Sequence, residues 1–308
     1  MQTLKTVGVI YYKTKIMNYE DRIAVFIDIL GFKELLNETV ERDGKDNTVA
    51  IEKLMDAYKA IRDVWDLDVE DKTPIIKKTD KNSKVITTFS DSVVISFSVT
   101  QRSEIFYTLL EIKWMIMRLL QRNILCRGAM AYGKLIHTDT MLFGPALVEA
   151  YILESKAANY PRIILDRSII DLAGQFPSLH HSASQEMEYV EALLERDLDG
   201  MYYIDYFTKA QDELDDPQYD FPVYIEMLGN KIRAGMNASK HSSKADIRVK
   251  YIWMKEKYNA MVGLSKNSRF IASLEKAGDS ELADFYRKLK PINPNPTLES
   301  LTSKQRSK

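Results

Sequence analysis

One acidic residue inside an apolar run constrains this chain more than any other feature of its sequence. Residues 23–30 (IAVFIDIL) are β-branched and almost continuously apolar, which is typical of a strand that is buried on both faces. Asp28 interrupts this run near its end. Because a buried carboxylate is costly unless it is paired or bound to a cation, the fold has to supply a positive charge to Asp28.

The pattern up to about residue 166 predicts helices packed on a mixed sheet. Gly31 ends the first strand. The remaining strands are expected at 85–89, 93–97, 126–135 and 162–165, with helices opening at 32–36 and covering 50–65, 104–122 and 145–158. The polar, lysine-rich stretch 71–84 is expected to be an exposed loop. The order strand, helices, hairpin, helix, strand, helix, strand indicates an α+β or α/β layer.

The second half of the chain has a different pattern and predicts a mainly helical extension. Helices are expected at 185–196, 223–232 and 250–262, with an extra strand at 201–207. Three prolines followed by a Ser/Lys/Gln tail indicate a disordered end. The expected organisation is a lead-in at 1–20, a sheet-containing domain at 21–175, the helical extension at 176–290 and the tail at 291–308.

Composition excludes several classes of protein. The 308 residues include 43 basic and 44 acidic side chains, so the protein has no overall positive charge that would favour binding to nucleic acid. A single cysteine, Cys126, excludes an internal disulfide. No apolar run reaches the roughly 20 residues of a membrane span, and the N-terminus lacks a secretory pattern. We therefore expect a soluble, cytoplasmic protein that binds neither membrane nor nucleic acid.

A second aspartate points to a metal site. Asp91 lies in the Ser90-Asp91-Ser92 turn of the predicted hairpin, and it can meet Asp28 if the two elements are neighbours in one sheet. Paired carboxylates suit Mg²⁺, which takes oxygen ligands and shares its other positions with substrate phosphates. The alternative is that Asp28 is a paired structural residue and that Asp91 is an ordinary turn residue.

Four motifs in order resemble the class III nucleotidyl cyclases. Residues 26–33 (FIDILGFK) resemble the F-x-D-I-x-G-F-T motif of the first strand, and 89–92 (FSDS) resemble the hairpin G-D with Ser90 in place of glycine. Residues 127–133, followed by Lys134, are similar to R-V-G-I-H-x-G. Residues 144–154 resemble the family's G-x-x-V-N-x-A-x-R-L-E helix, and residues 157–165 resemble the strand that follows it. The match covers about 22–166, roughly half of the chain.

The resemblance implies a ferredoxin-like cyclase fold working as a head-to-tail homodimer with active sites at the interface. It implies two Mg²⁺ or Mn²⁺ ions per site, held by Asp28, Asp91 and the carbonyl of Ile29. The triphosphate would be bound by turn amides and one basic side chain: Gly31, Phe32, Lys33 and Lys134. The 3′-hydroxyl would then attack the α-phosphate and release pyrophosphate.

Departures from the family motifs restrict which nucleotide base the resemblance implies as substrate. The positions that read a purine in adenylate and guanylate cyclases are Thr87 and Met141 here, and neither can repeat the usual hydrogen bonds. Residues 144–146, 149–151 and 160–163 resemble the pyrimidine cyclases of bacterial Pycsar antiphage defence. That branch implies cyclic UMP, or else cyclic CMP, as a signal to a separate effector protein. Glu149 is a candidate for orienting a base or a cation.

The helix residues that stabilise the transition state in the family are replaced by Val148 and Ile152. Either other residues take over, with Arg127 and Arg162 as the catalytic candidates, or the site is silent and the module only binds a nucleotide or a partner. A purine cyclase and a polymerase-like palm remain further alternatives. The basic, aromatic-containing segment 231–257 is interpreted as a solvated helical face rather than a nucleic-acid strip.

Overall fold

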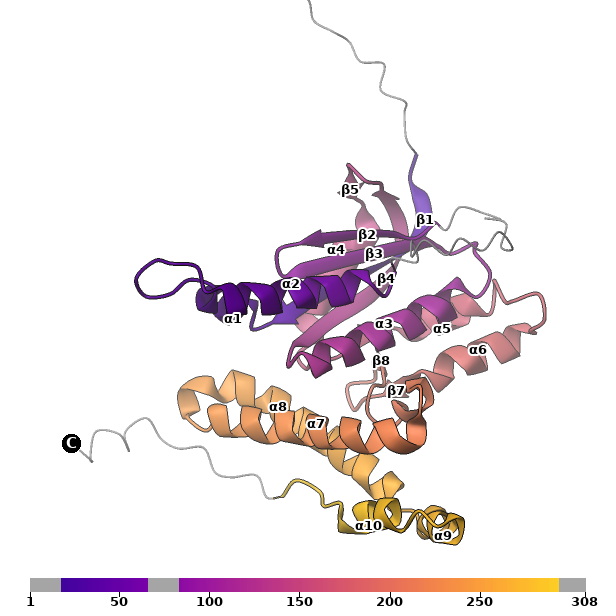
Figure 1. Cartoon of the computed structure of the whole chain (residues 1–308). Helices are drawn as coiled ribbons and strands as arrows, with labels where there is room; N and C mark the ends of the chain where they lie inside the picture. Colours follow the sequence, from indigo (N-terminus) through magenta and orange to yellow (C-terminus); the bar gives the residue numbers. More distant parts are fainter. Residues whose placement is uncertain (1–17, 66–82, 294–308) are drawn as a thin grey trace, which may run out of the picture.

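The protein is described from a computed structural model, in which residues 18–65 and 83–293 are described (Figure 1). An eight-stranded mixed sheet in this part of the chain is covered by helices, and a helical part follows. The α+β class and the helical C-terminal part are therefore confirmed. Most of the loop predicted at 71–84, the residues before 18 and the tail from 294 onwards lie outside the described residues.

The strands follow the order β2-β3-β1-β4-β6-β8-β7, and β5 pairs with β4. Neighbouring strands are antiparallel, except that β4 and β6 are parallel. Their bounds are β1 Glu20–Leu30, β2 Val85–Phe89, β3 Ser92–Ser98, β4 Leu125–His137, β5 Leu142–Phe143, β6 Ile163–Leu165, β7 Leu194–Arg196 and β8 Tyr202–Ile204.

Ten α-helices are assigned within the described residues. They are α1 Phe32–Glu38, α2 Thr48–Arg62, α3 Glu104–Gln121, α4 Pro145–Ala157, α5 Arg167–Ala173, α6 Ala183–Ala192, α7 Pro217–Ala238, α8 Ala245–Ser265, α9 Ser268–Ala277 and α10 Ser280–Lys288. Two short 3₁₀ turns, η1 Gln211–Glu213 and η2 Ser242–Lys244, precede α7 and α8. Among these helices, none combines the length and the apolar character that crossing a bilayer requires.

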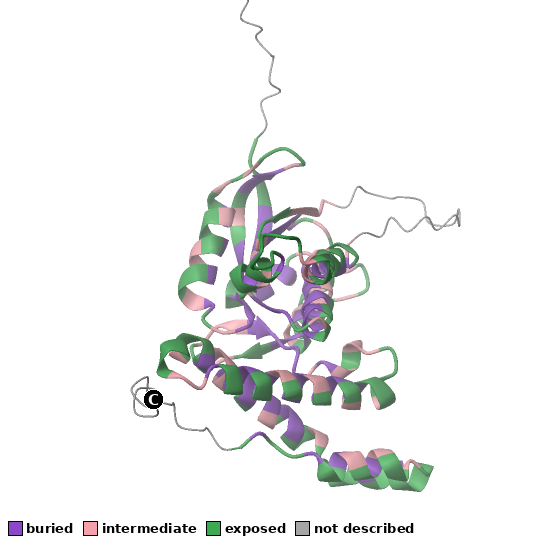
Figure 2. Ribbon diagram, turned by 60° about the vertical axis from the view of Figure 1, so that its left-hand side comes forward, coloured by how far each residue is buried: buried purple, intermediate pink, exposed green. Residues whose placement is uncertain are grey.

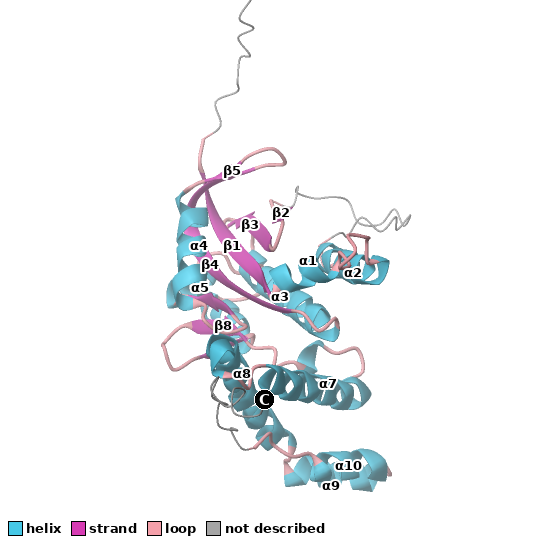
Figure 3. Ribbon diagram, turned by 90° about the vertical axis from the view of Figure 1, so that its left-hand side faces the viewer, coloured by secondary structure: helices cyan, strands magenta, loops and turns pink. Residues whose placement is uncertain are grey.

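Strand β1 is buried on both faces, as its sequence predicts. Its odd-numbered residues, such as Ile23 and Ile27, belong to the main core together with residues of α2 and α3. On the other face Ala24 packs with Ala146 and Ala150 of α4, in a second small core. Figure 3 shows α4 on one side of the sheet and α1, α2 and α3 on the other. Asp28 lies in the row of β1 side chains that faces the α4 side.

The sheet does not end at residue 175, where the sequence suggested a domain boundary. Strand β8 pairs with β6 through Tyr203 and Ile164, and β7 pairs with β8. The helix predicted at 185–196 ends at Ala192, because residues 194–196 add an edge strand to the sheet instead. Local periodicity cannot distinguish these outcomes, because the three residues 194–196 are too few to show a helical or a strand period.

The C-terminal helices form a separate layer at the β7–β8 end of the sheet (Figure 1). Helix α7 is longer than the predicted 223–232, because it starts at Pro217 and includes Pro222. Helices α7 and α8 pack against each other, and α9 and α10 form a second pair. Figure 2 shows buried residues on the faces where α7 and α8 meet the rest of the protein, with largely exposed surfaces outside.

The β2–β3 turn is strained at the position where the cyclase motif has glycine. Ser90 has a φ of 53°, in the left-handed region that glycine adopts at no steric cost. Two hydrogen bonds nevertheless stabilise the turn. The Tyr58 hydroxyl donates to the Ser90 carbonyl, and the Ile29 N–H donates to the Asp91 carbonyl at 2.8 Å.

We expect Ser90→Gly to raise the free energy of unfolding by about 1 kcal/mol, because it relieves this backbone strain. The matched change is Gly31→Ala, which puts a side chain on a residue with a φ of 77° and should lower stability by a similar amount. Urea unfolding of both variants measures the effect. A Ser90→Gly protein less stable than the wild type would show that the serine side chain contributes more than the strain costs.

Candidate functional site

The fold brings Asp28 and Asp91 to one corner of the sheet. Asp28 pairs with Ser92 across the β1–β3 ladder, so Asp91 in the adjoining turn lies next to the end of β1. The bond from the Ile29 N–H to the Asp91 carbonyl joins the two segments directly. The two aspartates that the sequence singled out therefore meet where β1 leads into α1.

Arg127 supplies the positive charge that the burial of Asp28 demands. It stands directly opposite Asp28 in the β1–β4 ladder, and its Nε donates to Asp28 Oδ2 at 3.2 Å. The same Nε lies 2.7 Å from Oε1 of Glu154. One guanidinium therefore bridges two carboxylates, one on β1 and one on α4.

Glu154 is a site residue that sequence reasoning missed. It is 3% exposed, whereas Glu149, the other acidic residue of the same helix, is exposed. A signal was present in the spacing. Ala146, Ala150 and Glu154 are four residues apart, so they share one helix face, and both alanines are buried. Helical periodicity alone places Glu154 against the sheet.

Burial dominates the electrostatics of the site. It raises the pKa of Asp28, the bond and charge of Arg127 oppose that shift, and the charge of Asp91 adds to it. Burial likewise raises the pKa of Glu154, with Arg127 lowering it and the two aspartates raising it. Arg127 pairs with Asp28 and Glu154, and the charge of Asp91 raises the pKa of both, so an additional cation would offset this repulsion.

The donor chemistry fits Mg²⁺ or Mn²⁺ if substrate completes the coordination. The described residues contain no cluster of three or more His, Cys, Asp or Glu placed to hold a metal ion. Asp28 and Asp91, with the carbonyl of Ile29 as expected, would leave positions for phosphate oxygens and water, which is the usual arrangement for Mg²⁺. A cation on Asp28 would compete with Arg127, which would keep Glu154 as its partner.

The turn that follows β1 places backbone near Asp28. Gly31 takes the left-handed conformation that starts α1, and the first N–H groups of a helix have no partner within it. Of the side chains in this turn, Lys33 is exposed and Phe32 is buried. The Phe32 ring packs edge-to-face on the Tyr58 ring, with the two ring centroids 6.3 Å apart. Phe32 thus has a packing role in addition to the proposed amide contact.

Lys134 does not join this turn within one chain. Its ammonium is 2.8 Å from the carboxylate of Asp21, at the opposite end of β1. It lies seven positions along β4 from Arg127, a distance of about 23 Å at the usual rise per residue. Lys134 can contact a triphosphate bound near Gly31 only if that triphosphate belongs to a site shared with another protomer.

The two expected base-binding residues lie beside a buried histidine. His137, at the end of β4, contacts the Thr87 hydroxyl through Nε2 at 2.9 Å and the Ser96 hydroxyl through Nδ1 at 2.8 Å. Burial, assisted by the charge of Arg22, lowers the pKa of His137 to about 4, so the ring is neutral near pH 7. Met141 is exposed and closes the turn that begins at Thr138, with a 2.8 Å backbone bond.

Arg162 is not placed for the catalytic role that the sequence suggested. Its side chain is fully buried, with Nη1 donating to Asp197 at 2.5 Å and Nη2 bonded to Asp199. Its guanidinium also lies over the rings of Tyr160 and Trp253. Because its guanidinium is buried between Asp197, Asp199 and these two rings, Arg162 joins β6 to the C-terminal helices and does not face the Asp28 corner.

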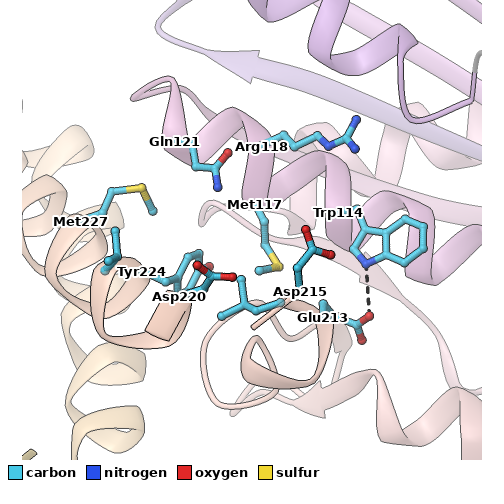
Figure 4. Close-up of a pocket in the computed structure, with 11 residues that line it drawn as sticks. Trp114, Met117, Arg118, Gln121, Glu213, Asp215, Asp220, Tyr224 and Met227 are labelled. Carbon is cyan, nitrogen blue, oxygen red and sulfur yellow. Dashed lines mark hydrogen bonds between the residues drawn. The ribbon is translucent and has the colours of Figure 1, made fainter. Parts of the chain in front are cut away.

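A separate cavity lies between α3 and α7 (Figure 4). It has a volume of about 470 Å³ and is lined in part by Trp114, whose indole donates to Glu213 at 3.1 Å. Met115 and Met117 are buried, while Trp114 is partly exposed to this cavity. None of the carboxylates around Arg127 lines it.

Comparison with known proteins adds no assignment: the sequence matches no protein-family model, and no curated protein matches it.

We expect Asp28→Asn to raise the free energy of unfolding at pH 7. Burial raises the pKa of Asp28, so the folded protein binds this proton more tightly than the unfolded chain. Stability therefore falls as the pH rises from about 3.8 through the folded pKa, and it stays lower above that pKa. The amide cannot ionise, so its advantage should vanish as the pH approaches 4.

Urea unfolding at several pH values tests this, with Asp43→Asn as the control of opposite sign. Asp43 is fully exposed and Lys45 lowers its pKa, so that variant should lose stability at neutral pH. A clear loss of stability in Asp28→Asn at pH 7 would show that the ion pair with Arg127 outweighs desolvation.

Replacing Arg162 tests its structural assignment. Arg162→Leu removes the guanidinium from the buried Asp197 and leaves it only the Lys257 ammonium and the Trp253 indole, so we expect a loss of about 3 kcal/mol, the lower end of the range for a broken buried pair. Arg167→Met is the matched control, because its ion pairs are exposed and worth about 1 kcal/mol or less. If Arg162→Leu unfolds like the wild type in urea, the buried cluster does not hold the fold together.

Proposed function

We propose that this protein is a divalent-metal-dependent nucleotidyl cyclase that converts a pyrimidine nucleoside triphosphate to its 3′,5′-cyclic monophosphate and pyrophosphate. The observation that carries the proposal is the meeting of Asp28 and Asp91 at the β1–α1 junction. The turn backbone and Arg127 lie at the same corner. UTP is the preferred substrate and CTP the alternative.

The order of the first elements supports a cyclase-type fold. Strands β2-β3-β1-β4 are mutually antiparallel, and the chain runs β1, α1, α2, β2, β3, α3, β4. This order is compatible with the ferredoxin-like β-α-β-β-α-β plan with one helical segment doubled. It supports the proposal that the chain has the fold that the four sequence motifs imply.

The residues at the corner suit phosphoryl chemistry, in which positioning and charge stabilisation supply most of the catalysis. Mg²⁺ or Mn²⁺, held by Asp28 and Asp91, would supply charge neutralisation and activation of the attacking hydroxyl. The amides of Gly31, Phe32 and Lys33 would bind phosphate oxygens. Arg127 would stabilise negative charge that develops on the transferring phosphate.

The arrangement of the base-binding candidates favours a head-to-tail homodimer. Thr87, Met141 and Lys134 lie away from the Asp28 corner within one chain. In a head-to-tail pair, one protomer would contribute the carboxylates and the other the base and phosphate contacts. A neutral Thr87–His137 pair without a charged purine reader suits a pyrimidine. Antiphage signalling to a separate effector rests on the resemblance alone, and the proposed cytoplasmic location rests on the composition of the sequence.

One observation favours a second candidate, a catalytically silent module that binds nucleotide or a partner. Arg127 already provides Asp28 and Glu154 with a cation. An internal guanidinium that permanently replaced the metal would leave the fold intact and the chemistry absent. The replacement of the family's transition-state residues by Val148 and Ile152 points in the same direction.

Incubation of the purified protein with each of the four ribonucleoside triphosphates and Mn²⁺, followed by mass detection, separates the two candidates. We expect cyclic UMP as the main product, with turnover reduced at least about 100-fold in Asp28→Asn and in Asp91→Asn. The exposed variant Asp43→Asn should behave like the wild type. If no triphosphate gives a cyclic product, the cyclase proposal is wrong and the silent module is favoured. Linked dinucleotides would instead indicate a polymerase-like palm.

A further inference from the structure

We infer that His137 is a positioning residue that fixes the Thr87 hydroxyl as a hydrogen-bond donor, so that the base site takes uracil in preference to cytosine. The inference rests on the proposed function, because it takes Thr87 as a base contact. It deepens that function by giving the preference for UTP a physical cause. One chain of hydrogen bonds, together with the burial of its members, carries it.

The chain of hydrogen bonds begins at a positive charge. The Nε of Arg22 donates to the Ser96 hydroxyl at 3.0 Å. The same hydroxyl lies 2.8 Å from Nδ1 of His137, and Nε2 of that ring lies 2.9 Å from the Thr87 hydroxyl. The four side chains come from β1, β3, β4 and β2, so their positions are set by the sheet itself.

Ser96 determines the direction of these hydrogen bonds, because its hydroxyl has one proton to donate. The Ser96 side chain is completely buried, so water does not accept that proton. The hydroxyl already accepts from Arg22, which has only donors, and its other partner in the described part of the chain is Nδ1 of His137. The Ser96 hydroxyl therefore donates to Nδ1, and Nδ1 carries no proton.

The single proton of the His137 ring is consequently on Nε2. Burial and the charge of Arg22 lower the pKa of His137 to about 4, against the opposing charge of Asp139, so the ring is neutral at pH 7. A neutral ring whose Nδ1 accepts has its proton on Nε2. Nε2 then donates to the Thr87 oxygen, and the hydrogen of the Thr87 hydroxyl finds no acceptor among the described residues.

Thr87 presents this hydrogen on the face of the sheet that carries Asp28. Thr87 pairs with Val94, and Val94 pairs with Phe26, so the three side chains share one face. Phe26 precedes Asp28 by two residues, which puts these two on the same face as well. Thr87 is partly exposed, so a ligand can reach its hydroxyl. In the proposed head-to-tail dimer, this face of one protomer would lie opposite the Asp28 corner of the other.

A hydroxyl that is held as a donor distinguishes the two pyrimidines. Uracil has a carbonyl oxygen at position 4, which accepts from Thr87, whereas cytosine has an amino group there, which only donates. With cytosine bound, the Thr87 hydrogen would be buried without an acceptor. The free energy lost with one such unmet donor corresponds to a preference for uracil of about 10-fold.

The position of the ring proton is measured by nuclear magnetic resonance on protein labelled with nitrogen-15 histidine. We expect His137 to have a protonated Nε2 and an unprotonated Nδ1 at pH 7, and to stay neutral down to about pH 5. The His137→Gln variant identifies its signals among the 4 histidines. A proton on Nδ1, or a doubly protonated ring at pH 7, overturns the inference.

The base preference is measured with 3′-deoxy-UTP and 3′-deoxy-CTP, which lack the hydroxyl that cyclisation requires. Calorimetry with Mn²⁺ should show about 10-fold tighter binding of the uridine analogue to the wild type. Thr87→Val keeps the shape of the side chain and removes the hydroxyl, so the two analogues should bind it about equally. Thr88→Val is the matched control, because Thr88 is exposed and points to the opposite face, and it should keep the wild-type ratio.

Two changes at His137 distinguish positioning from a purely structural role. In His137→Leu nothing orients the Thr87 hydroxyl, so the ratio of the two affinities should fall to about 1. In His137→Gln the amide can accept from Ser96 and donate to Thr87, so the uridine preference should be retained. A general loss of stability would weaken the binding of both analogues alike and leave their ratio unchanged.

Turnover of UTP separates this inference from the proposed function. If the wild type makes cyclic UMP but binds both analogues equally, or if His137→Leu keeps the wild-type ratio, the role of His137 is overturned while the function stands. If the wild type makes no cyclic product but has a uridine preference that Thr87→Val and His137→Leu abolish, the cyclase proposal fails and the base contact stands. A wild type that binds neither analogue overturns the inference.

Discussion

The bridge from Asp28 through Arg127 to Glu154 is the interaction around which the rest of the structure is arranged. It places two carboxylates and one guanidinium where β1, β4 and α4 meet, near the end of a strand whose central side chains are buried. A charge at that position requires a partner from a neighbouring element, because the strand itself has none to offer. The β1–β4 register satisfies the requirement by setting Arg127 directly across from Asp28.

Close approach of backbones makes this register possible. At Gly128, next to Arg127, a Cβ would lie 2.5 Å from the carbonyl of Phe26 and 3.3 Å from the side chain of Ile163. The Gly128 N–H also donates to the Arg162 carbonyl at 3.0 Å. The bridge is therefore connected through one glycine to Arg162, whose guanidinium is bound to Asp197, the same carboxylate that holds Trp253 and Lys257 of α8.

This continuity ties the helical extension to the sheet. The buried cluster around Asp197 fixes α8 against the sheet by charge, hydrogen bonds and ring stacking together, so the helix cannot shift without exposing or breaking a buried ion pair.

The sequence by itself determined the first strand, the hairpin with Asp91 at its turn and the α+β class, because apolar periodicity and turn chemistry are local properties. It also singled out Asp28 as a residue in need of a partner. Only the tertiary structure decided which partner that was. Strand register pairs Asp28 with Arg127, and helix packing buries Glu154. The chain returns to the sheet as β7 and β8, and Asp197 between these two strands forms a buried ion pair with Arg162. These contacts join residues up to 99 positions apart, as in the Asp28–Arg127 bond, and such pairings depend on how whole elements pack rather than on any local pattern.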